Sequence, residues 1–457
     1  AAERHAHEEA IEFLDLAARG APSEEDEAKA LALQAKVQFG TGRLEGAVST
    51  GEKALGSKAL TPDERLDLRL LQGRALIELG DWETVENQLR ALQRVEFKES
   101  PTNRLKLRWV HYLLLKRAVR SNNREQAEGL LSYVDDVQSG LQEERSAMSR
   151  ADGYEFSDRT IQEYTLKQLT VAGYNLFYRN IEVANSAIRE IEPLTSKLPF
   201  ELRQQVYSLG SLVASRLADW DRASALALRG GEEAEQLNDT WALTMAYLNR
   251  SVIEMERGNF NVASKLIRQC TEIGCLGSAS NHRAIVKTNV GDQLFYRERY
   301  RDATEAYREA VRIGRQGEFT YLLPELYASL GLTLLAEGRS EEAKKVSTKI
   351  GEDEYLGGVQ DRFKVYWLRT YWSTTNGNVD ALDALRERAS NEYQTDIPSA
   401  AKSKWLADLL EAELFSSKNG SNGKKEYPVS PNYLREINLG WFAYHTRRWL
   451  RRVIAKN

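Results

Sequence analysis

Small and aromatic residues recur at fixed offsets along most of this chain of 457 residues. In the stretch GDQLFYRERYRDATEAYREAVRIG, Gly291 stands seven residues before a turn at Glu298, Tyr300 follows that turn by two residues, and Ala303 comes three further on. A motif repeated at such regular offsets indicates an array built from copies of one small structural unit. We therefore searched the chain for the same set of residues.

The copies share a small residue, a turn seven residues later, a large apolar residue, and a second small residue. The clearest copies are Gly73, Gly80 and Trp82; Ser211, Ala218, Trp220 and Ala223; Ser251, Gly258, Phe260 and Ala263; and Gly331, Gly338 and Ala343. Less complete copies are Ala35, Gly42, Leu44 and Ala47; Leu115, Asn122 and Ala127; Ala172, Ile181 and Ala184; and Gly377 and Val379.

Each unit is predicted to be two antiparallel helices joined by a tight turn. Glycine or asparagine at the turn tolerates the left-handed conformation that ends a helix. The small residues let the two backbones approach closely, and the aromatic side chain fills the helix crossing. Because one helix pair cannot bury its apolar face alone, neighbouring pairs must stack. The sequence therefore predicts an all-α fold, a right-handed α-solenoid of stacked antiparallel helix pairs.

These residues resemble the tetratricopeptide repeat over roughly residues 25 to 390. The turns are mostly about 40 residues apart, whereas the standard unit of that family has about 34 residues. The longer period resembles that of the sensor arms of bacterial signal-transduction ATPases and of maltose-regulator-type transcription activators. This resemblance implies longer helices than in the standard repeat.

The repeat also predicts how the chain is divided. Residues 1–24 are expected to form an N-terminal half-repeat helix, and residues 25–400 a solenoid of about nine helix pairs with an insertion near 141–160. Residues 401–457 are expected to form C-terminal capping helices, with a Gly/Ser/Pro-rich flexible linker at 419–432. The half repeat and the first residue, an alanine rather than methionine, favour a processed or excised piece whose true N-terminus lies upstream.

The composition argues against several classes of partner. A formal net charge of -4 provides no global basic field, so nucleic acid is not expected as a partner. No stretch approaches the roughly 20 apolar residues of a membrane span. The chain has two cysteines and no signal peptide, which favours a reducing, cytoplasmic location.

The sequence contains no recognisable catalytic or metal-binding constellation. His5 and His7 are two residues apart and would point to different helix faces, and we interpret them as surface residues. Cys270 and Cys275 are expected to be a buried thiol and a loop thiol. The segment GSNGKK lacks the spacing of a phosphate-binding loop. We therefore expect no enzymatic activity, no cofactor and no metal site.

The resemblance implies that the first helix of each pair lines a concave surface. Residues about one turn from the small position would then face a binding groove. This offset selects mainly aromatic and cationic side chains, which commonly dominate binding energies. The candidates are Trp109, Tyr112, Lys116, Arg120, Phe177, Arg216, Phe295, Tyr296, Trp367 and Tyr371. The alternative for any single one is packing between adjacent repeats.

The closing segment WFAYHTRRWLRRVIAKN carries four arginines, one lysine and no acid. Trp449, Leu450 and Val453 could form one apolar edge of a helix that caps the solenoid. The alternative is a basic docking tail for an acidic partner, a membrane surface or nucleic acid. The tail residues would be Arg447, Arg448, Arg451 and Arg452.

The sequence thus predicts a scaffold that binds a protein or peptide on its concave surface. An alternative prediction is the ligand-sensing regulatory arm of a larger signal-transduction ATPase, effector or transcription regulator. In that case a small-molecule effector could bind, and binding would shift an autoinhibited state towards an active one.

Overall fold

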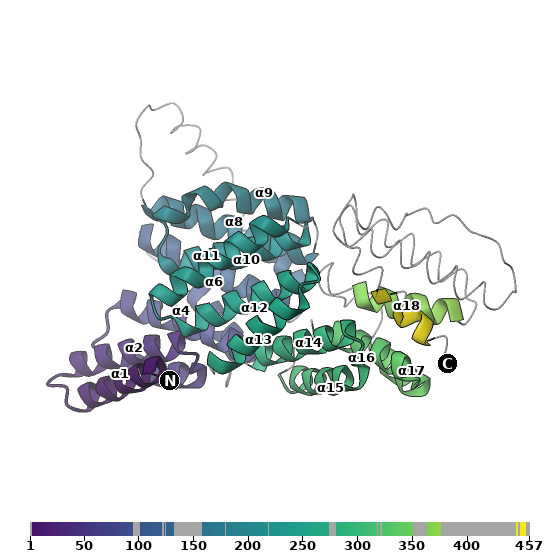
Figure 1. The fold of residues 1–457 in the computed structure, drawn as a ribbon. Helices are drawn as coiled ribbons and strands as arrows, with labels where there is room; N and C mark the ends of the chain where they lie inside the picture. The colour runs from purple at the N-terminus through teal and green to yellow at the C-terminus, as the bar shows by residue number, and fades with distance from the viewer. Residues whose placement is uncertain are drawn as a thin grey trace, which may run out of the picture. The chain divides into compact units, whose positions relative to one another are not determined.

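The computed structural model describes residues 2–94, 101–120, 123, 125–131, 158–178, 180–217, 219–273, 280–317, 319, 322–350, 363–375, 445–446 and 448–453. Every regular element within these residues is a helix (Figure 1). This confirms the all-α, solenoid-like prediction. Residues 141–157 of the predicted insertion and the linker at 419–432 lie outside the described residues.

The chain divides into two compact units. Unit 1 comprises residues Ala1–Ser211, Ser224–Asn249 and Arg268–Arg283, and unit 2 comprises Leu212–Ala223, Arg250–Ile267 and Ala284–Asn457. The helices up to the middle of the chain are α1 (Ala2–Arg19), α2 (Glu24–Gly40), α3 (Leu44–Gly56), α4 (Pro62–Leu79), α5 (Trp82–Arg94), α6 (Pro101–Arg120), α8 (Asp158–Tyr178), α9 (Ile181–Ile191) and the 3-10 helix η1 (Glu192–Lys197). Those that follow are α10 (Phe200–Arg216), α11 (Trp220–Gln236), α12 (Thr240–Glu256), α13 (Phe260–Ile273), α14 (Ser280–Tyr296), α15 (Tyr300–Gln316), α16 (Leu323–Glu337), α17 (Ser340–Ser347) and α18 (Phe363–Thr375).

The turns between paired helices have the backbone conformation that the repeat predicts. Gly42, Gly80, Gly258 and Gly338 have φ angles of 74°, 82°, 80° and 82°, and the non-glycine turn residue Glu298 has a φ of 62°. This left-handed conformation ends one helix so that the next can run back along it. The other predicted turn positions, 122, 179, 218 and 377, lie outside the described residues.

Helix starts are equally readable from the sequence in α4. The Thr61 hydroxyl accepts a hydrogen bond from the Glu64 backbone N–H, while the Glu64 carboxylate accepts one from the Thr61 backbone N–H. Pro62 occupies the first turn, where its missing N–H costs nothing. This capping box fixes the start of the helix that carries Asp67, Arg74 and Glu78.

The small residues of the motif allow close packing, as predicted. In unit 2 a Cβ added at Gly291 would lie 2.6 Å from a ring carbon of Tyr307, so only glycine fits there. The aromatic motif residues Trp220 and Tyr300 are 9% and 4% exposed, which confirms that they are buried. The regular spacing of the opening motif therefore serves helix packing.

Residues 448–453 of unit 2 are helical and bury an apolar edge. Trp449, Leu450 and Val453 are at most 1% exposed and belong to the hydrophobic core of unit 2. The indole N–H of Trp449 donates a 2.9 Å hydrogen bond to the Leu332 carbonyl oxygen. These contacts anchor residues 448–453 to the core of unit 2, and their role as a cap of the solenoid stays a prediction.

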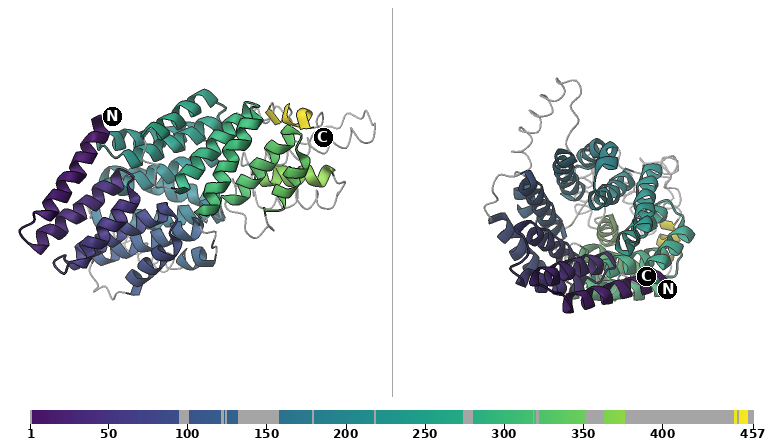
Figure 2. Two further views of the ribbon diagram at one scale, coloured as in Figure 1. Left: turned by 90° about the horizontal axis from the view of Figure 1, so that it is seen from below. Right: turned by 90° about the vertical axis from the view of Figure 1, so that its left-hand side faces the viewer.

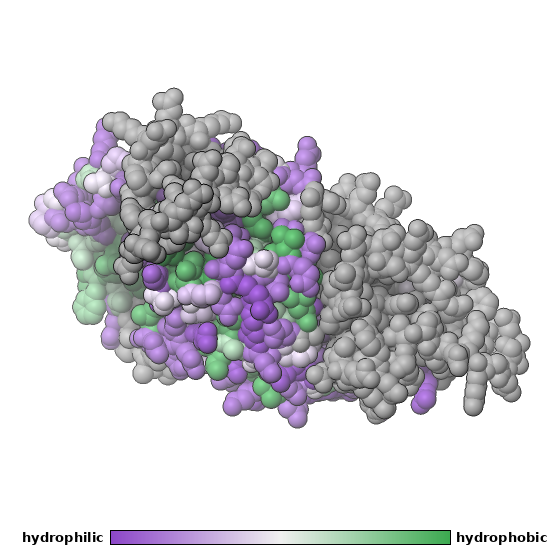
Figure 3. All heavy atoms as spheres, turned by 90° about the horizontal axis from the view of Figure 1, so that it is seen from above, coloured by the Kyte–Doolittle hydropathy of each residue, from purple (hydrophilic) through white to green (hydrophobic). Residues whose placement is uncertain are grey.

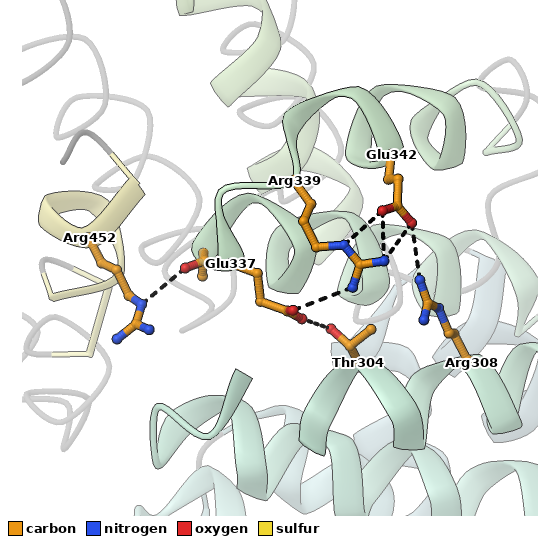
Figure 4. A network of polar contacts seen from close by, with 7 residues as sticks. Thr304, Arg308, Glu337, Arg339, Glu342 and Arg452 are labelled. Carbon is orange, nitrogen blue, oxygen red and sulfur yellow. Dashed lines mark hydrogen bonds and ion pairs between the residues drawn. The ribbon is translucent and has the colours of Figure 1, made fainter. Parts of the chain in front are cut away.

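Polar side chains join α15, α16 and α17 at the surface of unit 2 (Figure 4). The Arg339 guanidinium donates two hydrogen bonds of 2.8 and 2.7 Å to the two carboxylate oxygens of Glu342, and Arg308 donates a third of 3.1 Å. The Thr304 hydroxyl donates to Glu337. Such exposed pairs fix local geometry but contribute little free energy, about 0–1 kcal/mol each.

Candidate functional site: a pocket in unit 1

Unit 1 contains a pocket of about 520 Å³. Its lining comes mainly from the first helices of successive pairs, namely α2, α4, α6, α10, α12 and the start of α14, with a smaller part from α11. Figure 2 draws the helices of unit 1 in purple to teal. The repeat thus places residues far apart in sequence around one cavity.

Two polar contacts join helices that are distant in sequence at this pocket. The Thr240 hydroxyl, at the start of α12, donates a 3.3 Å hydrogen bond to the Gly40 carbonyl oxygen at the end of α2, 200 residues away. The Asn249 amide donates a 3.0 Å hydrogen bond to the Ser208 hydroxyl, linking α12 to α10. The first and later pairs of unit 1 therefore enclose the pocket together.

Aromatic side chains form much of the pocket wall. Trp109 and Tyr112, on α6, contact each other edge to face with ring centroids 6.0 Å apart. The Tyr112 hydroxyl donates a 3.0 Å hydrogen bond to the Gln205 side chain on α10. Trp241, on α12, contacts the His282 ring edge to face at 5.0 Å. These fixed rings offer a large rigid contact area to a ligand.

Arg74, on α4, lies in this wall with its guanidinium near two aromatic rings. Its Cζ is 4.6 Å from the ring centroid of Phe39 and 6.0 Å from that of Trp109. Within the described part of unit 1 the guanidinium forms no hydrogen bond or ion pair. Burial lowers the pKa of Arg74 from its ordinary value, and the carboxylates of Glu201 and Asp239 act in the opposite direction.

Two lysines of the pocket, by contrast, are already paired. The Lys106 ammonium lies 3.2 Å from an Asp63 carboxylate oxygen and 3.1 Å from one of Asp67. The Lys116 ammonium lies 3.6 Å from the Glu78 carboxylate, which also approaches the His282 imidazole nitrogen at 3.4 Å. These charged groups interact with one another and join α4, α6 and α14.

Acidic groups approach the pocket from α10 and α12. Asp239 directly precedes α12, and its carboxylate accepts a 2.8 Å hydrogen bond from the Ala242 backbone N–H. Burial raises the pKa of Asp239, while that hydrogen bond and the charge of Arg74 lower it. Glu201, at the start of α10, is exposed. Neither carboxylate forms an ion pair within the described residues.

The structure places the predicted groove residues in three different settings. Trp109, Tyr112 and Lys116 all line the pocket, as the offset predicted. Arg216 is half-buried and is not among the lining residues. The side chains of Arg120 and Phe177 lie outside the described residues.

Four of the five predicted groove residues that belong to unit 2, all except Arg216, are core residues instead. Phe295, Tyr296, Trp367 and Tyr371 are 6%, 7%, 0% and 4% exposed. Trp367 contacts Phe295 at a centroid distance of 5.8 Å, and both Trp367 and Tyr371 contact Trp449. Selecting groove residues by their offset from the small motif residue assumes that the inner face of the first helix of each pair is open. In unit 2 that face packs against α18 and the helical residues 448–453, so the surface exposure expected for these four is wrong.

The arginines of the predicted basic tail are in part engaged within unit 2. Arg448 forms an ion pair with Glu298, and Arg452 donates a 3.0 Å hydrogen bond to the Ala336 carbonyl oxygen (Figure 4). Arg451 is exposed, and Arg447 lies outside the described residues.

Other candidate chemistry is sparse. Cys270 is buried, as predicted, and its sulfur is 3.6 Å from the Thr244 carbonyl oxygen, whereas Cys275 and the side chains of His5 and His7 lie outside the described residues. Among the residues that the structure describes, no group of three or more His, Cys, Asp or Glu side chains could hold a metal ion. No helix in the described ranges is long and apolar enough to cross a membrane. On the face shown in Figure 3, groups of hydrophobic residues lie among hydrophilic ones in the described part of the chain.

The polar and aromatic members of the pocket that sequence reasoning missed include Arg74, Glu201, Asp239 and Trp241. A signal existed for Arg74, because it follows the small motif residue Gly73 and shares a helix face with Leu70 and Glu78. The others follow from the way distant pairs meet around the pocket, which no local spacing encodes.

No known protein family and no curated protein sequence matches the chain. Several solved structures are similar to the chain. A Rap protein complexed with Competence and Sporulation Factor has a TM-score of 0.55 at 10% identity, covering 87% of this chain and 100% of that chain. The apo form of RapI has a TM-score of 0.45 at 12% identity, covering 86% and 97%. The human IFIT1 dimer with m7Gppp-AAAA has a TM-score of 0.47 at 12% identity, covering 98% and 95%. The likeness to the first of these structures shows that the chain shares the helical-repeat fold of that Rap protein.

Proposed function

We propose that this protein is a helical-repeat scaffold that binds a short peptide in the pocket of unit 1. The observation that carries the proposal is the pocket itself. It is of ligand size, and it lies where the first helices of the repeats converge. Aromatic rings line it together with an arginine that forms no ion pair among the described residues. These are the side chains that most often dominate binding energies.

A peptide fits this wall better than a wholly apolar molecule would. Polar groups alternate with the rings, including the side chains of Gln204 and Gln205 on α10 and Asn249 on α12. Amide side chains can donate to and accept from a peptide backbone. The Rap protein with the same fold is complexed with Competence and Sporulation Factor. We propose a peptide ligand for this chain because of the residues that line its pocket.

The proposal is tested with a tetrapeptide library incubated with the full chain, followed by size-exclusion separation and mass spectrometry of the bound peptides. We expect a set of peptides to be retained. Replacing Trp109 with alanine removes a half-exposed wall residue and should weaken binding of the selected peptides by at least about 2 kcal/mol, roughly 30-fold.

Phe13 provides the matched control. It is an aromatic residue of α1 that is 68% exposed and does not line the pocket. Phe13→Ala should leave the dissociation constants unchanged. If no peptide is retained, or if Trp109→Ala and Phe13→Ala bind equally well, the pocket is not a peptide site.

A further inference from the structure

We infer that the ligand of this pocket is zwitterionic, with an anionic carboxylate that binds Arg74 and a cationic amine that binds Glu201 and Asp239. The inference rests on the proposed function and specifies the charge of the peptide. It follows from which charged groups of the pocket are paired and which are not.

The anion-binding end is the Arg74 guanidinium. Its Cζ lies 4.6 Å from the ring centroid of Phe39 and 6.0 Å from that of Trp109, and its N–H groups have no hydrogen-bond partner in the described part of unit 1. A planar guanidinium presents its donors in a fork that matches the two oxygens of a carboxylate. Lys36, one turn before Gly40 on α2, is exposed, forms no ion pair in the described part of unit 1 and adds a second positive charge on this side.

The cation-binding end is formed by α10 and α12. Glu201 and Asp239 both line the pocket, and both influence the pKa of Arg74, so their charges are felt at the guanidinium although no ion pair forms. The Asp239 carboxylate uses one oxygen to accept from the Ala242 N–H, and a carboxylate can accept further hydrogen bonds. An ammonium group of a ligand is the natural partner for two carboxylates that face a cavity.

A purely anionic ligand is disfavoured by the same groups. It would gain the attraction of Arg74 but would meet the repulsion of Glu201 and Asp239 at the partly desolvated wall. A purely cationic ligand would be attracted by Glu201 and Asp239 but repelled by Arg74. A ligand with one charge of each sign satisfies both ends, because the remaining charges of the wall already form ion pairs: Lys106 with Asp63 and Asp67, and Lys116 with Glu78.

The test uses the tetrapeptide library in four forms: both ends free, the amino end acetylated, the carboxyl end amidated, and both ends blocked. The library contains apolar residues with aspartate and lysine at each position. We expect retention to require one anionic and one cationic group, supplied by the chain ends in the free form or by aspartate and lysine side chains in the fully blocked form. Loss of either charge should weaken binding at least about tenfold.

Near-isosteric variants assign each charge to its partner. Arg74→Gln should remove the preference for the carboxylate and keep that for the amine. Glu201→Gln combined with Asp239→Asn should do the reverse, and asparagine at 239 still caps α12. Arg69→Gln is the matched control, because Arg69 lies on the same helix but does not line the pocket.

The possible outcomes separate the two proposals. If uncharged, fully blocked peptides bind as tightly as charged ones and Trp109→Ala weakens both, the pocket is a peptide site and the zwitterionic ligand is wrong. If Arg74→Gln leaves the charge preferences unchanged, the assignment of the carboxylate to Arg74 is wrong. If no peptide is retained, the proposed function fails together with this inference.

Discussion

A half-buried arginine of unit 1, Arg74, and a buried lysine of unit 2, Lys364, differ in what surrounds them. Lys364, in unit 2, lies 2.5 Å from an Asp292 carboxylate oxygen and 3.2 Å from one of Glu325. Arg74, in unit 1, contacts two aromatic rings and has no ion pair in the described residues. Burial alone would lower the pKa of Lys364, but the two carboxylates raise it above its ordinary value, whereas the pKa of Arg74 is lowered.

Structural and functional charges in a repeat protein can be distinguished by the groups that surround them. A buried cation whose partners come from the same chain stabilises the fold, as Lys364 of α18 does by joining α14 and α16. A cation held by neutral rings at a cavity keeps its hydrogen-bonding capacity for a molecule from outside. Variants of Lys364 and Arg74 test this difference.

The largest effect is expected at Lys364. Lys364→Met leaves the carboxylates of Asp292 and Glu325 buried without a counter-charge, which should destabilise the chain by about 3–5 kcal/mol. Lys345→Met, at an exposed position of α17, should change stability by within about 0.5 kcal/mol. The measurement is urea unfolding followed by circular dichroism. Equal midpoints for the two variants would contradict the structural role of Lys364.

A pH dependence is expected from His111 in unit 1. Burial, and secondarily the charge of Arg108, lower the pKa of His111 to about 4. Because the unfolded chain takes up a proton near pH 6.5 and the folded chain does not, stability is lost as the pH falls from about 6.5 towards 4, by roughly 3 kcal/mol in total. Unfolding at pH 7 and pH 5 should show part of this loss in the parent chain and less in His111→Gln. Parallel pH profiles would rule out this contribution.

The packing of the repeat predicts a smaller effect at Gly291. Gly291→Ala places a methyl group against Tyr307, whose ring is 1% exposed and whose hydroxyl donates a 2.5 Å hydrogen bond to Asp292. The ring cannot move freely, so we expect about 1–3 kcal/mol of destabilisation. At the exposed helical Gly129 an added Cβ meets no atom within 4 Å, and Gly129→Ala should be neutral or stabilising by up to about 1 kcal/mol. Thermal melts of both variants test this difference in sign.

The sequence predicted those features that depend on local geometry. The turn positions at Gly80 and Gly338, the close approach at Gly291 and the buried Tyr300 all follow from offsets within one helix pair. Trp109, Tyr112 and Lys116 were found because the inner face of their helix is open in unit 1.

The features that could not be predicted depend on contacts between distant pairs. Trp367 was expected at a surface, but Trp449, 82 residues later, packs against its ring at 5.0 Å. Arg74 meets the charges of Glu201 and Asp239 only because α12 returns to α2 through the bond from Thr240 to Gly40. Such contacts depend on the cumulative rotation from one repeat to the next. The residue offsets within one repeat do not determine this rotation.

The smallest change in stability is expected at Arg74 itself. Arg74→Gln removes cation–π contacts with Phe39 and Trp109, which contribute about 0.5–1 kcal/mol. It breaks no ion pair, so urea unfolding should show a loss no larger than that. A loss comparable to that of Lys364→Met would mean that Arg74 is a structural cation after all.

The most direct test of the account is the dissociation constant of the best retained free-ended tetrapeptide for the parent chain, Arg74→Gln and Arg69→Gln, measured by isothermal titration calorimetry. We predict at least about tenfold weaker binding for Arg74→Gln, parent-like binding for Arg69→Gln, and near-parent stability for both. Parent-like binding by a folded Arg74→Gln chain would contradict the claim that this unpaired cation is kept for a ligand.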